Sequence, residues 1–365
     1  MDIIRFIEEV EDPRDSWKIQ HNLSSILFTT LCAVLSGAQT WDDVALFGQT
    51  KQAWLSKYIS FDNGIPSAWT FRRIFTLLRP ECLEILLRTH ADQVMGSHNA
   101  DHIAIDGKSL RSSKRKDLSC LHSLSAWCHE KGLVLAEKDV DKKSNEITAI
   151  PLLLNTLDLK GATVSIDAAG CQKTIASQIK EQKGDYVLAL KKNHPKLYQT
   201  IEKYITDQGP SCDNKLHDVF DEGHGRLVRR RYFGYDISHL EQAKEWSGLR
   251  SVIAVETIFS QPNSSTHVTA QWRYYLSSHP ANHQQLTDYI RNHWSVENKL
   301  HWILDVHLKE DEDRKAERQS AKAFAILKRM SLNIIRSKNG HTKGSLRGKL
   351  KKASWDINYL LSLLV

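Results

Sequence analysis

Residues 102–107 read HIAIDG and residues 163–170 read TVSIDAAG. Each stretch contains a short apolar run that ends in an aspartate, a pattern typical of a buried strand followed by a turn. Two more strand candidates, Leu121–Cys128 and Leu133–Val140, and a helical pattern, Ile147–Leu157, lie between them. Three strands followed by alternating helices and strands predict an α/β layer with a mixed sheet.

The rest of the chain divides into segments of different periodicity. Beyond Asp167, a helix at 173–182 and a strand at 186–190 continue the alternation of helices and strands. From about residue 209 the helical period gives way to β-rich segments, and helical patterning resumes at His283. We therefore predict a helical N-terminal domain (1–95), the first part of an α/β core (96–208), a β-rich insertion (209–282) and a helical completion of the core (283–365).

The predicted N-terminal domain shows helical periodicity with turn signals between its segments. A helical domain of this size ahead of an enzyme often binds a partner. Arg72, Arg73 and Arg79 favour DNA as that partner, although a solvated helix face would explain the same charges. We expect residues 1–95 to bind DNA or another partner.

The composition excludes a disordered chain, because 41% of the 365 residues are hydrophobic and 25% are charged. The net charge of +7 hides an uneven distribution: residues 314–352 hold 13 Lys or Arg and one acid, Glu317. Such clusters can neutralise DNA phosphates, whereas each taken alone is also typical of a solvated surface. Two further clusters supply candidate DNA contacts, namely Lys108, Arg111, Lys114, Arg115, Arg226, Arg229 and Arg230.

Other features bear on the compartment. The longest apolar stretch, Leu23–Leu35, has 13 residues and is too short to cross a membrane, so it predicts a buried helix. The first nine residues lack the basic start of a secretory signal. The six cysteines form no CxxC pair, so neither a zinc site nor a disulfide framework is indicated. We expect a cytoplasmic protein without a membrane partner, associated with the nucleoid when bound to DNA.

Asp106 and Asp167 are predicted as the last residues of their strands. The ends of strands in an open α/β sheet form the ligand crevice. If the two strands are neighbours, their carboxylates meet, and a hard divalent cation such as Mg²⁺ or Mn²⁺ would neutralise the repulsion between them. The alternative is structural, with Asp106 in a turn and Asp167 as a helix cap.

Glu297 is the third candidate acid. On one regular helix from Ile290 to Leu308 it falls in an apolar stripe, where a carboxylate needs a cation, a protonated partner or an edge that reaches solvent. His293 and His301 flank it four residues before and after. They are either metal ligands or, more often, buried groups that support other ligands. The stripe consists of Ile290, Trp294, Glu297, His301, Leu304 and Leu308.

Four motifs resemble those of the DDE-type insertion-sequence transposases that include the H-repeat-associated proteins. The resemblance extends over nearly the whole chain, and HNL (21–23) and GIPS (64–67) match the segment that precedes the catalytic core in that family. The four motifs are AIDGKSLR (104–111), KSNEITAIP (143–151), SIDAAGCQ (165–172) and RNHWSVENKLHW (291–302).

The resemblance implies a fold and an activity. The fold is an RNase H-like mixed-sheet core with a β-rich insertion, preceded by an all-helical N-terminal domain. The activity is that of an Mg²⁺- or Mn²⁺-dependent DNA transposase, with two ions held by Asp106, Asp167 and Glu297. Its partners are double-stranded DNA, as transposon ends and target, and a second copy of the chain when two ends are held in synapsis. We expect cleavage at the ends followed by strand transfer into the target.

One part of the family pattern is missing. Related transposases place Tyr, Arg and Lys around the glutamate where this chain has Ile290, His293 and Leu304. Arg291 and Lys299 are therefore candidates for those roles and for DNA contacts. The acidic run 310–313 is an alternative source of the third ligand.

Two other functions remain open. One is an inactive DNA-binding relic of a mobile element, and the other is a stand-alone RNase H-like, structure-specific nuclease. Either Trp246 or Trp272 could stack on an unpaired base, although core packing is the more usual role of such residues.

Overall fold

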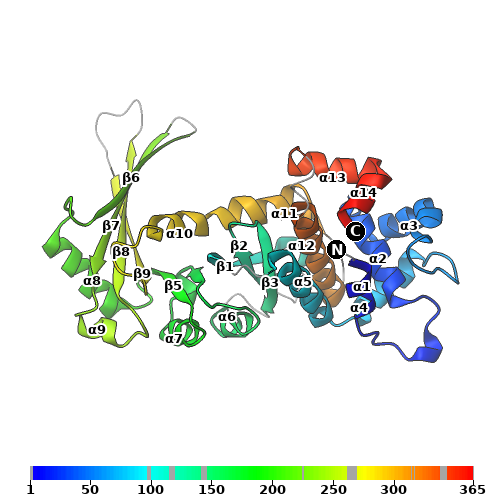
Figure 1. Ribbon diagram of the computed structural model, residues 1–365, viewed down its shortest axis with the longest axis horizontal. Coiled ribbons are helices and arrows are strands. Elements are labelled where there is room, and N and C mark those ends of the chain that lie inside the picture. Colours follow the sequence, from blue (N-terminus) through cyan, green and yellow to red (C-terminus); the bar gives the residue numbers. More distant parts are fainter. Residues whose placement is uncertain are drawn as a thin grey trace. The chain divides into compact units, whose positions relative to one another are not determined.

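A computed structural model shows a mixed α/β protein with one nine-stranded sheet (Figure 1). The structure describes residues 3–96, 100–114, 120–140, 146–223, 226–260, 269–313, 315, 317–337 and 343–364, apart from a few side chains next to the gaps. The chain forms two compact units. Unit 1 is Met1–His98, Gly107–Asn145 and Glu297–Val365; unit 2 is Asn99–Asp106 and Glu146–Val296.

The sheet has the strand order β3-β2-β1-β4-β5-β9-β8-β7-β6. Strand β4 pairs in parallel with β1 and with β5. Strand β2 pairs antiparallel with β3. The neighbours β5, β9, β8, β7 and β6, in that order, also pair antiparallel. The strands are β1 (His102–Leu110), β2 (Leu121–Cys128), β3 (Leu133–Val140), β4 (Thr163–Ile166), β5 (Asp185–Leu190), β6 (Lys215–Gly223), β7 (Arg226–Asp236), β8 (Ser251–Ser260) and β9 (Thr269–Ser277).

Unit 1 is organised around α12 (Arg318–Ser337), which is buried over most of its length. It contacts α2, α4, α5 and β3, and Figure 1 shows it alongside α5. The predicted buried helix is confirmed as α2 (Leu23–Leu35), in which every residue except Ser24 is buried. The other helices are α1 (Ile3–Glu8), α3 (Trp41–Leu55), α4 (Ala68–Leu77), α5 (Pro80–Met95), α11 (Trp302–Val306), α13 (Leu346–Trp355) and α14 (Ile357–Leu364).

Unit 2 holds the parallel strands and the antiparallel extension. Between β8, β9 and the following helix, a buried cluster of Tyr232, Val255, Tyr275 and Ile290 forms part of its core. The predicted alternation of helices and strands between residues 147 and 208 is confirmed, and most helices and strands begin and end within one or two residues of the predicted positions. The helices are α6 (Glu146–Leu154), α7 (Lys173–Glu181), α8 (Pro195–Gln208), α9 (Glu241–Lys244) and α10 (Leu286–His293).

Two predicted boundaries differ in the structure. Strand β1 does not end at Asp106 but continues to Leu110, because β1 also has β2 as a neighbour and outlasts the shorter β4. The segment 209–282 is β-rich as predicted, yet β9 pairs directly with β5, so its strands extend the same sheet. The predicted domain limits at residues 95, 208 and 282 stay predictions.

No helix in the described ranges is both long and apolar enough to cross a membrane.

Candidate active site

Asp106 and Asp167 lie side by side in the sheet. The parallel pairing of β1 with β4 matches Ile105 with Ile166, and each aspartate is the next residue of its chain. Neighbouring strands are about 4.8 Å apart, so the two carboxylates start from adjacent positions. Both residues are half-buried, and solvent can therefore reach them.

The structural alternative for Asp167 is also present. Its Oδ1 accepts a hydrogen bond of 2.9 Å from the backbone N–H of Ala169 and so caps a short 3-10 helix, Ala168–Gly170. Within the described parts of the chain, its Oδ2 has no hydrogen-bond partner. One oxygen of Asp167 thus holds the local turn while the other is available to a ligand.

A buried hydrogen-bonded chain links β1, β4 and α10 through His102, Ser165 and His293. Nε2 of His102 is 2.7 Å from Oγ of Ser165, and the same Oγ is 2.9 Å from Nδ1 of His293. Burial lowers the pKa of His293 to about 4, against the opposing charge of Asp167. His293 is therefore neutral near pH 7 and acts here as a buried hydrogen-bonding group.

Glu297 does not lie in a buried stripe. The predicted regular helix from Ile290 to Leu308 is interrupted after α10, and a π-helix covers Glu297–His301. The wider turn of a π-helix changes the angle between successive side chains, so the stripe is broken. Glu297 is exposed, which corresponds to the edge position that reaches solvent.

The two histidines that flank Glu297 are both shielded from solvent: His293 is buried and His301 is half-buried. Burial, together with the nearby charges of Arg329 and Lys108, lowers the pKa of His301 to about 3. No group of three His, Cys, Asp or Glu side chains close enough to hold a metal occurs among the described residues.

Lys108, one of the predicted DNA contacts, is buried and ion-paired. It is 6% exposed, and its Nζ lies 2.7 Å from Oδ1 of Asp305, 3.3 Å from Oδ1 of Asp311 and 3.4 Å from Oε2 of Glu310. Burial opposes the charge, but the three carboxylates outweigh it and raise the pKa of Lys108. The charge cluster after Asp106 is thus partly an internal ion-pair network of unit 1.

The neighbouring basic residues are more accessible. The side chain of Arg111 is 86% exposed, with Nε 3.8 Å from Oδ2 of Asp311. Lys114 is also exposed. Arg115 and the side chain of Arg226 lie outside the described residues.

The arginines of β7 are paired with acids. Nε and Nη2 of Arg229 donate hydrogen bonds of 2.9 and 2.7 Å to the two carboxylate oxygens of Asp218 and thereby lower its pKa. Arg230 forms an ion pair with Asp221. Arg291 and Lys299 are exposed, and the backbone carbonyl of Lys299 accepts a 2.5 Å hydrogen bond from Arg336.

Each carboxylate of the acidic run 310–313 has a basic partner. Glu310 pairs with Arg329 and with Lys108, and Asp311 pairs with Lys108. The remaining pairs are Glu312 with Lys309, and Asp313 with Lys315 and Lys328. The cluster is therefore accounted for without a metal ion.

A cavity of about 480 Å³ opens beside Asp167, and we call it the Asp167 cavity. Its lining includes Lys191, Lys192, Trp272 and Trp294. Positive charge and aromatic faces next to a candidate metal ligand suit a nucleic-acid strand, because phosphates pair with the charges and bases stack on the rings. Of the two tryptophans proposed for stacking, Trp272 lines this cavity, whereas Trp246 is buried against His194.

Sequence reasoning missed several of these residues, although the signals were present. Lys191 and Lys192 directly follow β5, which pairs in parallel with β4. They thus stand at the strand end next to Asp167, and the argument used for the aspartates would have found them. His102 and Ser165 lie four and two residues before an aspartate, and the period of two puts each on the same face as that aspartate.

Two family models match the chain: one described as DDE_Tnp_1-associated over residues 4–91, and one described as Transposase DDE domain over residues 97–334. A transposase DDE domain preceded by its associated N-terminal segment is the class that these matches define. The chain belongs to the DDE-domain transposase family of insertion-sequence elements. Domains of this family generally use divalent metal ions.

Similar proteins come from Escherichia coli K12. The "Putative protein YbfL" is 37% identical over 99% of this chain and 97% of its own length. The "H repeat-associated putative transposase YhhI" is 36% identical over 99% of this chain and 97% of its own length. Among solved structures, a piggyBac transposase synaptic complex with hairpin DNA matches with a TM-score of 0.48 at 11% identity, over 99% of this chain and 78% of that chain.

Proposed function

We propose that this protein is a DNA transposase that cleaves phosphodiester bonds at the ends of its element and joins the freed ends to target DNA. The observation that carries the proposal is the register of β1 and β4, which brings Asp106 and Asp167 to adjacent positions. Family membership supports the same activity. The strand order β3-β2-β1-β4-β5, with β1, β4 and β5 parallel, supports an RNase H-like core.

Asp106, Asp167 and Glu297 are the residues that would hold two divalent cations, Mg²⁺ or Mn²⁺. The donor set fits such ions, because carboxylate oxygens are the hard ligands that they prefer. Oδ2 of Asp167, which has no hydrogen-bond partner in the described parts of the chain, and the exposed carboxylate of Glu297 also fit. When bound, two such ions would supply an activated water and charge stabilisation for the leaving 3′ oxygen.

The chain's own residues position the reacting DNA. Lys191 and Lys192 would neutralise phosphates next to Asp167, and Trp272 would stack on a base in the same cavity. His293, which is buried and neutral, would fix the β4 strand through Ser165. Exposed Arg111 and the helices of residues 3–95 would bind DNA outside the cavity. Holding two element ends together requires a second copy of the chain, so we propose a homodimer in synapsis.

A nicking assay on the terminal repeats of the element tests the proposal. Wild-type protein should cleave with Mg²⁺ or Mn²⁺ and then transfer the strand. Asp106→Asn, Asp167→Asn and Glu297→Gln should each lower the cleavage rate roughly 1,000-fold, because each removes a charged oxygen ligand worth several kcal/mol. DNA affinity and melting temperature, measured on the same samples, should change little.

Asp158→Asn is the matched control, since Asp158 is an exposed turn aspartate of the same unit as Asp106 and Asp167. Its cleavage rate should equal that of the wild type. Wild-type protein that binds the repeats but never cleaves them would identify an inactive relic. Cleavage without end specificity or strand transfer would identify a stand-alone nuclease.

A further inference from the structure

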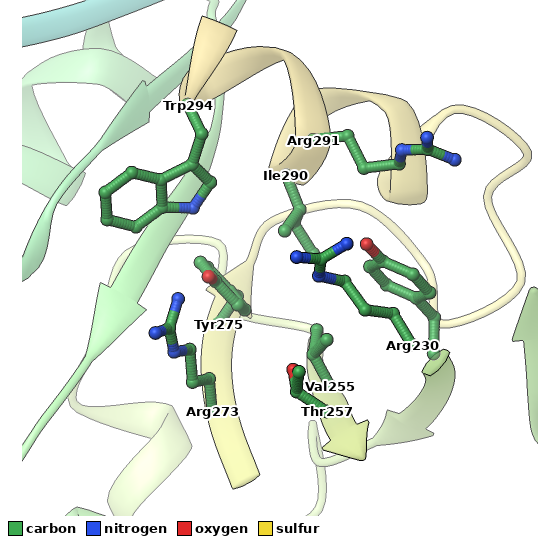
Figure 2. Close-up of a pocket in the computed structure, with 9 residues that line it drawn as sticks. Arg230, Val255, Thr257, Arg273, Tyr275, Ile290, Arg291 and Trp294 are labelled. Atoms are coloured by element: carbon green, nitrogen blue, oxygen red, sulfur yellow. The ribbon is translucent and has the colours of Figure 1, made fainter. Parts of the chain in front are cut away.

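A second cavity of unit 2, about 350 Å³ in volume, is lined by Arg230, Arg273 and Arg291, and we call it the arginine cavity (Figure 2). Figure 2 shows Arg291 and Trp294 on the helix at one side, and Arg230 and Arg273 on strands at the other. The arginines come from three different elements, β7, β9 and α10. Their convergence is a product of the fold and not of a local run of basic residues.

The charges of this cavity are only partly compensated. Arg230 pairs with Asp221, whereas neither Arg273 nor Arg291 has an acidic partner among the described residues. No Asp or Glu belongs to the described lining. On the same sheet, Arg229 and Arg231 are each matched with an acid. The positive charges of Arg273 and Arg291 line one cavity without a paired carboxylate in the described chain, and a bound anion would stabilise both.

The floor of the cavity is rigid and offers hydroxyl groups. Tyr232, Val255, Tyr275 and Ile290 belong to the buried core cluster, so the walls are already in place without a ligand. Burial raises the pKa of Tyr232, against the opposing charges of Arg291 and Arg230, and keeps its hydroxyl protonated as a donor. A preformed site with several donors binds an anion without first having to reorganise.

The arginine cavity shares a wall with the Asp167 cavity. Arg273, Tyr275 and Trp294 line both. The guanidinium of Arg273 lies over the Trp294 ring, 5.8 Å from its centroid. This contact holds Arg273 between the two cavities and leaves its edge free for hydrogen bonds. A strand with one nucleotide beside Asp167 would therefore have a neighbouring phosphate close to Arg273.

We propose that the arginine cavity binds a phosphate group of the DNA strand whose adjacent nucleotide occupies the Asp167 cavity. The inference rests on the proposed function and extends it, since it assigns a specific phosphate site to Arg230, Arg273 and Arg291. Phosphate is the ligand chemistry because a guanidinium donates two parallel hydrogen bonds to phosphate oxygens. A free nucleotide or pyrophosphate offers the same chemistry, and the experiment separates these sources.

The test measures binding of the full chain to a fluorescein-labelled duplex that carries the terminal repeat, by anisotropy at several salt concentrations. Arg273→Gln and Arg291→Gln should each weaken binding about tenfold and reduce the slope of log K against log salt by about one. The variant that combines Arg273→Gln and Arg291→Gln should have a slope smaller by about two. Arg273→Lys should restore the slope but only part of the affinity, because lysine keeps the charge and loses the fork.

Arg250→Gln is the matched control, since Arg250 is an exposed arginine of the same unit that does not line either cavity. It should bind as the wild type does, and all variants should melt at the same temperature. If wild-type protein binds the duplex and both glutamine variants bind it equally well with the same slope, the inference is wrong while the proposed function stands.

Titration calorimetry with pyrophosphate and thymidine 5′-monophosphate distinguishes the two sources. Protein that binds these free phosphates in an Arg291-dependent manner but does not bind the duplex would support the phosphate site and overturn its DNA source together with the proposed function. Protein that binds neither the duplex nor the free phosphates would overturn both proposals.

Discussion

Arg329 shows how much of the chain's positive charge is internal. It is 0% exposed on α12, its Nε lies 2.9 Å from Oε2 of Glu137, and it also pairs with Glu310. Lys328 and Lys315 are buried beside Asp313 in the same region. The net charge of residues 314–352 therefore overstates what this stretch can offer to DNA, because several of its basic side chains are paired with the preceding acids Glu310 and Asp313 and with the distant Glu137.

Replacing Arg329 should destabilise the protein strongly. Arg329→Met leaves the buried Glu137 without its cation and leaves Glu310 with Lys108 alone, so we expect the free energy of unfolding to fall by about 3–5 kcal/mol. Urea unfolding followed by tryptophan fluorescence measures the change. Lys322→Met on the same helix removes a less buried pair with Asp139, 2.8 Å long, and should cost about 1 kcal/mol or less. Equal losses for the two variants would contradict this account.

Among the elements, β7 depends on a close approach at Gly234. A Cβ at this position would lie 2.2 Å from the backbone carbonyl oxygen of Ala281, a distance that real Cβ atoms do not show. Backbone atoms cannot yield as a flexible side chain can, so Gly234→Ala must displace either β7 or the segment after β9.

Gly234→Ala should lower the melting temperature by several degrees, corresponding to about 2 kcal/mol or more. Differential scanning fluorimetry measures the shift. A Cβ at Gly348 in α13 would meet Oγ of Ser345 at 3.3 Å, a side-chain atom that needs to shift by only a few tenths of an ångström, so Gly348→Ala should change the melting temperature much less than Gly234→Ala. A Gly234→Ala protein as stable as the wild type would show that the two backbones are not in fixed contact.

Periodicity was sufficient to predict most elements but not their ends or irregularities. The apolar runs and amphipathic patterns of 121–140 and 146–208 predicted their strands and helices because those patterns follow from local geometry. The continuation of β1 past Asp106 depends on its neighbour β2, and the π-helix at Glu297 depends on tertiary packing. The spacing of apolar residues does not reveal either the longer β1 or the π-helix. The predicted stripe around Glu297 was therefore wrong.

For the molecule as a whole, the site could be predicted in outline. Strand ends and a resemblance to a family were enough to nominate Asp106 and Asp167, and the register of β1 and β4 confirms that they are neighbours. The sequence was a poorer guide to the DNA contacts. Lys108, which was predicted, is buried in ion pairs, whereas Arg273, which lies in no charge run, lines two cavities. Isolated residues that only the fold brings together cannot be found from their spacing in the sequence.

Both units should lose stability in acid. Burial lowers the pKa of His90 and His293 to about 4, and of His301 to about 3. These histidines are neutral in the folded protein, whereas in the unfolded chain they bind protons near pH 6.5. Their contribution is therefore fully present above pH 6.5 and is lost as the pH falls toward 4.

His90→Leu isolates one of these groups. Both ring nitrogens of His90 are buried without a hydrogen-bond partner in the described chain, so removing them should stabilise unit 1 by about 1 kcal/mol at pH 7. Between pH 7 and pH 5, the free energy of unfolding of the variant should also fall by about 2 kcal/mol less than that of the wild type. Melting temperatures across this pH range measure both effects, and parallel curves would refute a neutral buried His90.

The division of the chain into units also sets the order in which it can fold during synthesis. Helices α1 to α5 leave the ribosome first, but the helix that covers them, α12, begins at Arg318. At a synthesis rate of about 5–20 residues per second, the apolar faces of these helices stay exposed for roughly 10–45 s before α12 is made. Unit 2 ends at Val296 and is complete sooner. A copy of the gene that loses its 3′ end would therefore yield a finished unit 2 attached to N-terminal helices without their core, a product that proteases would remove.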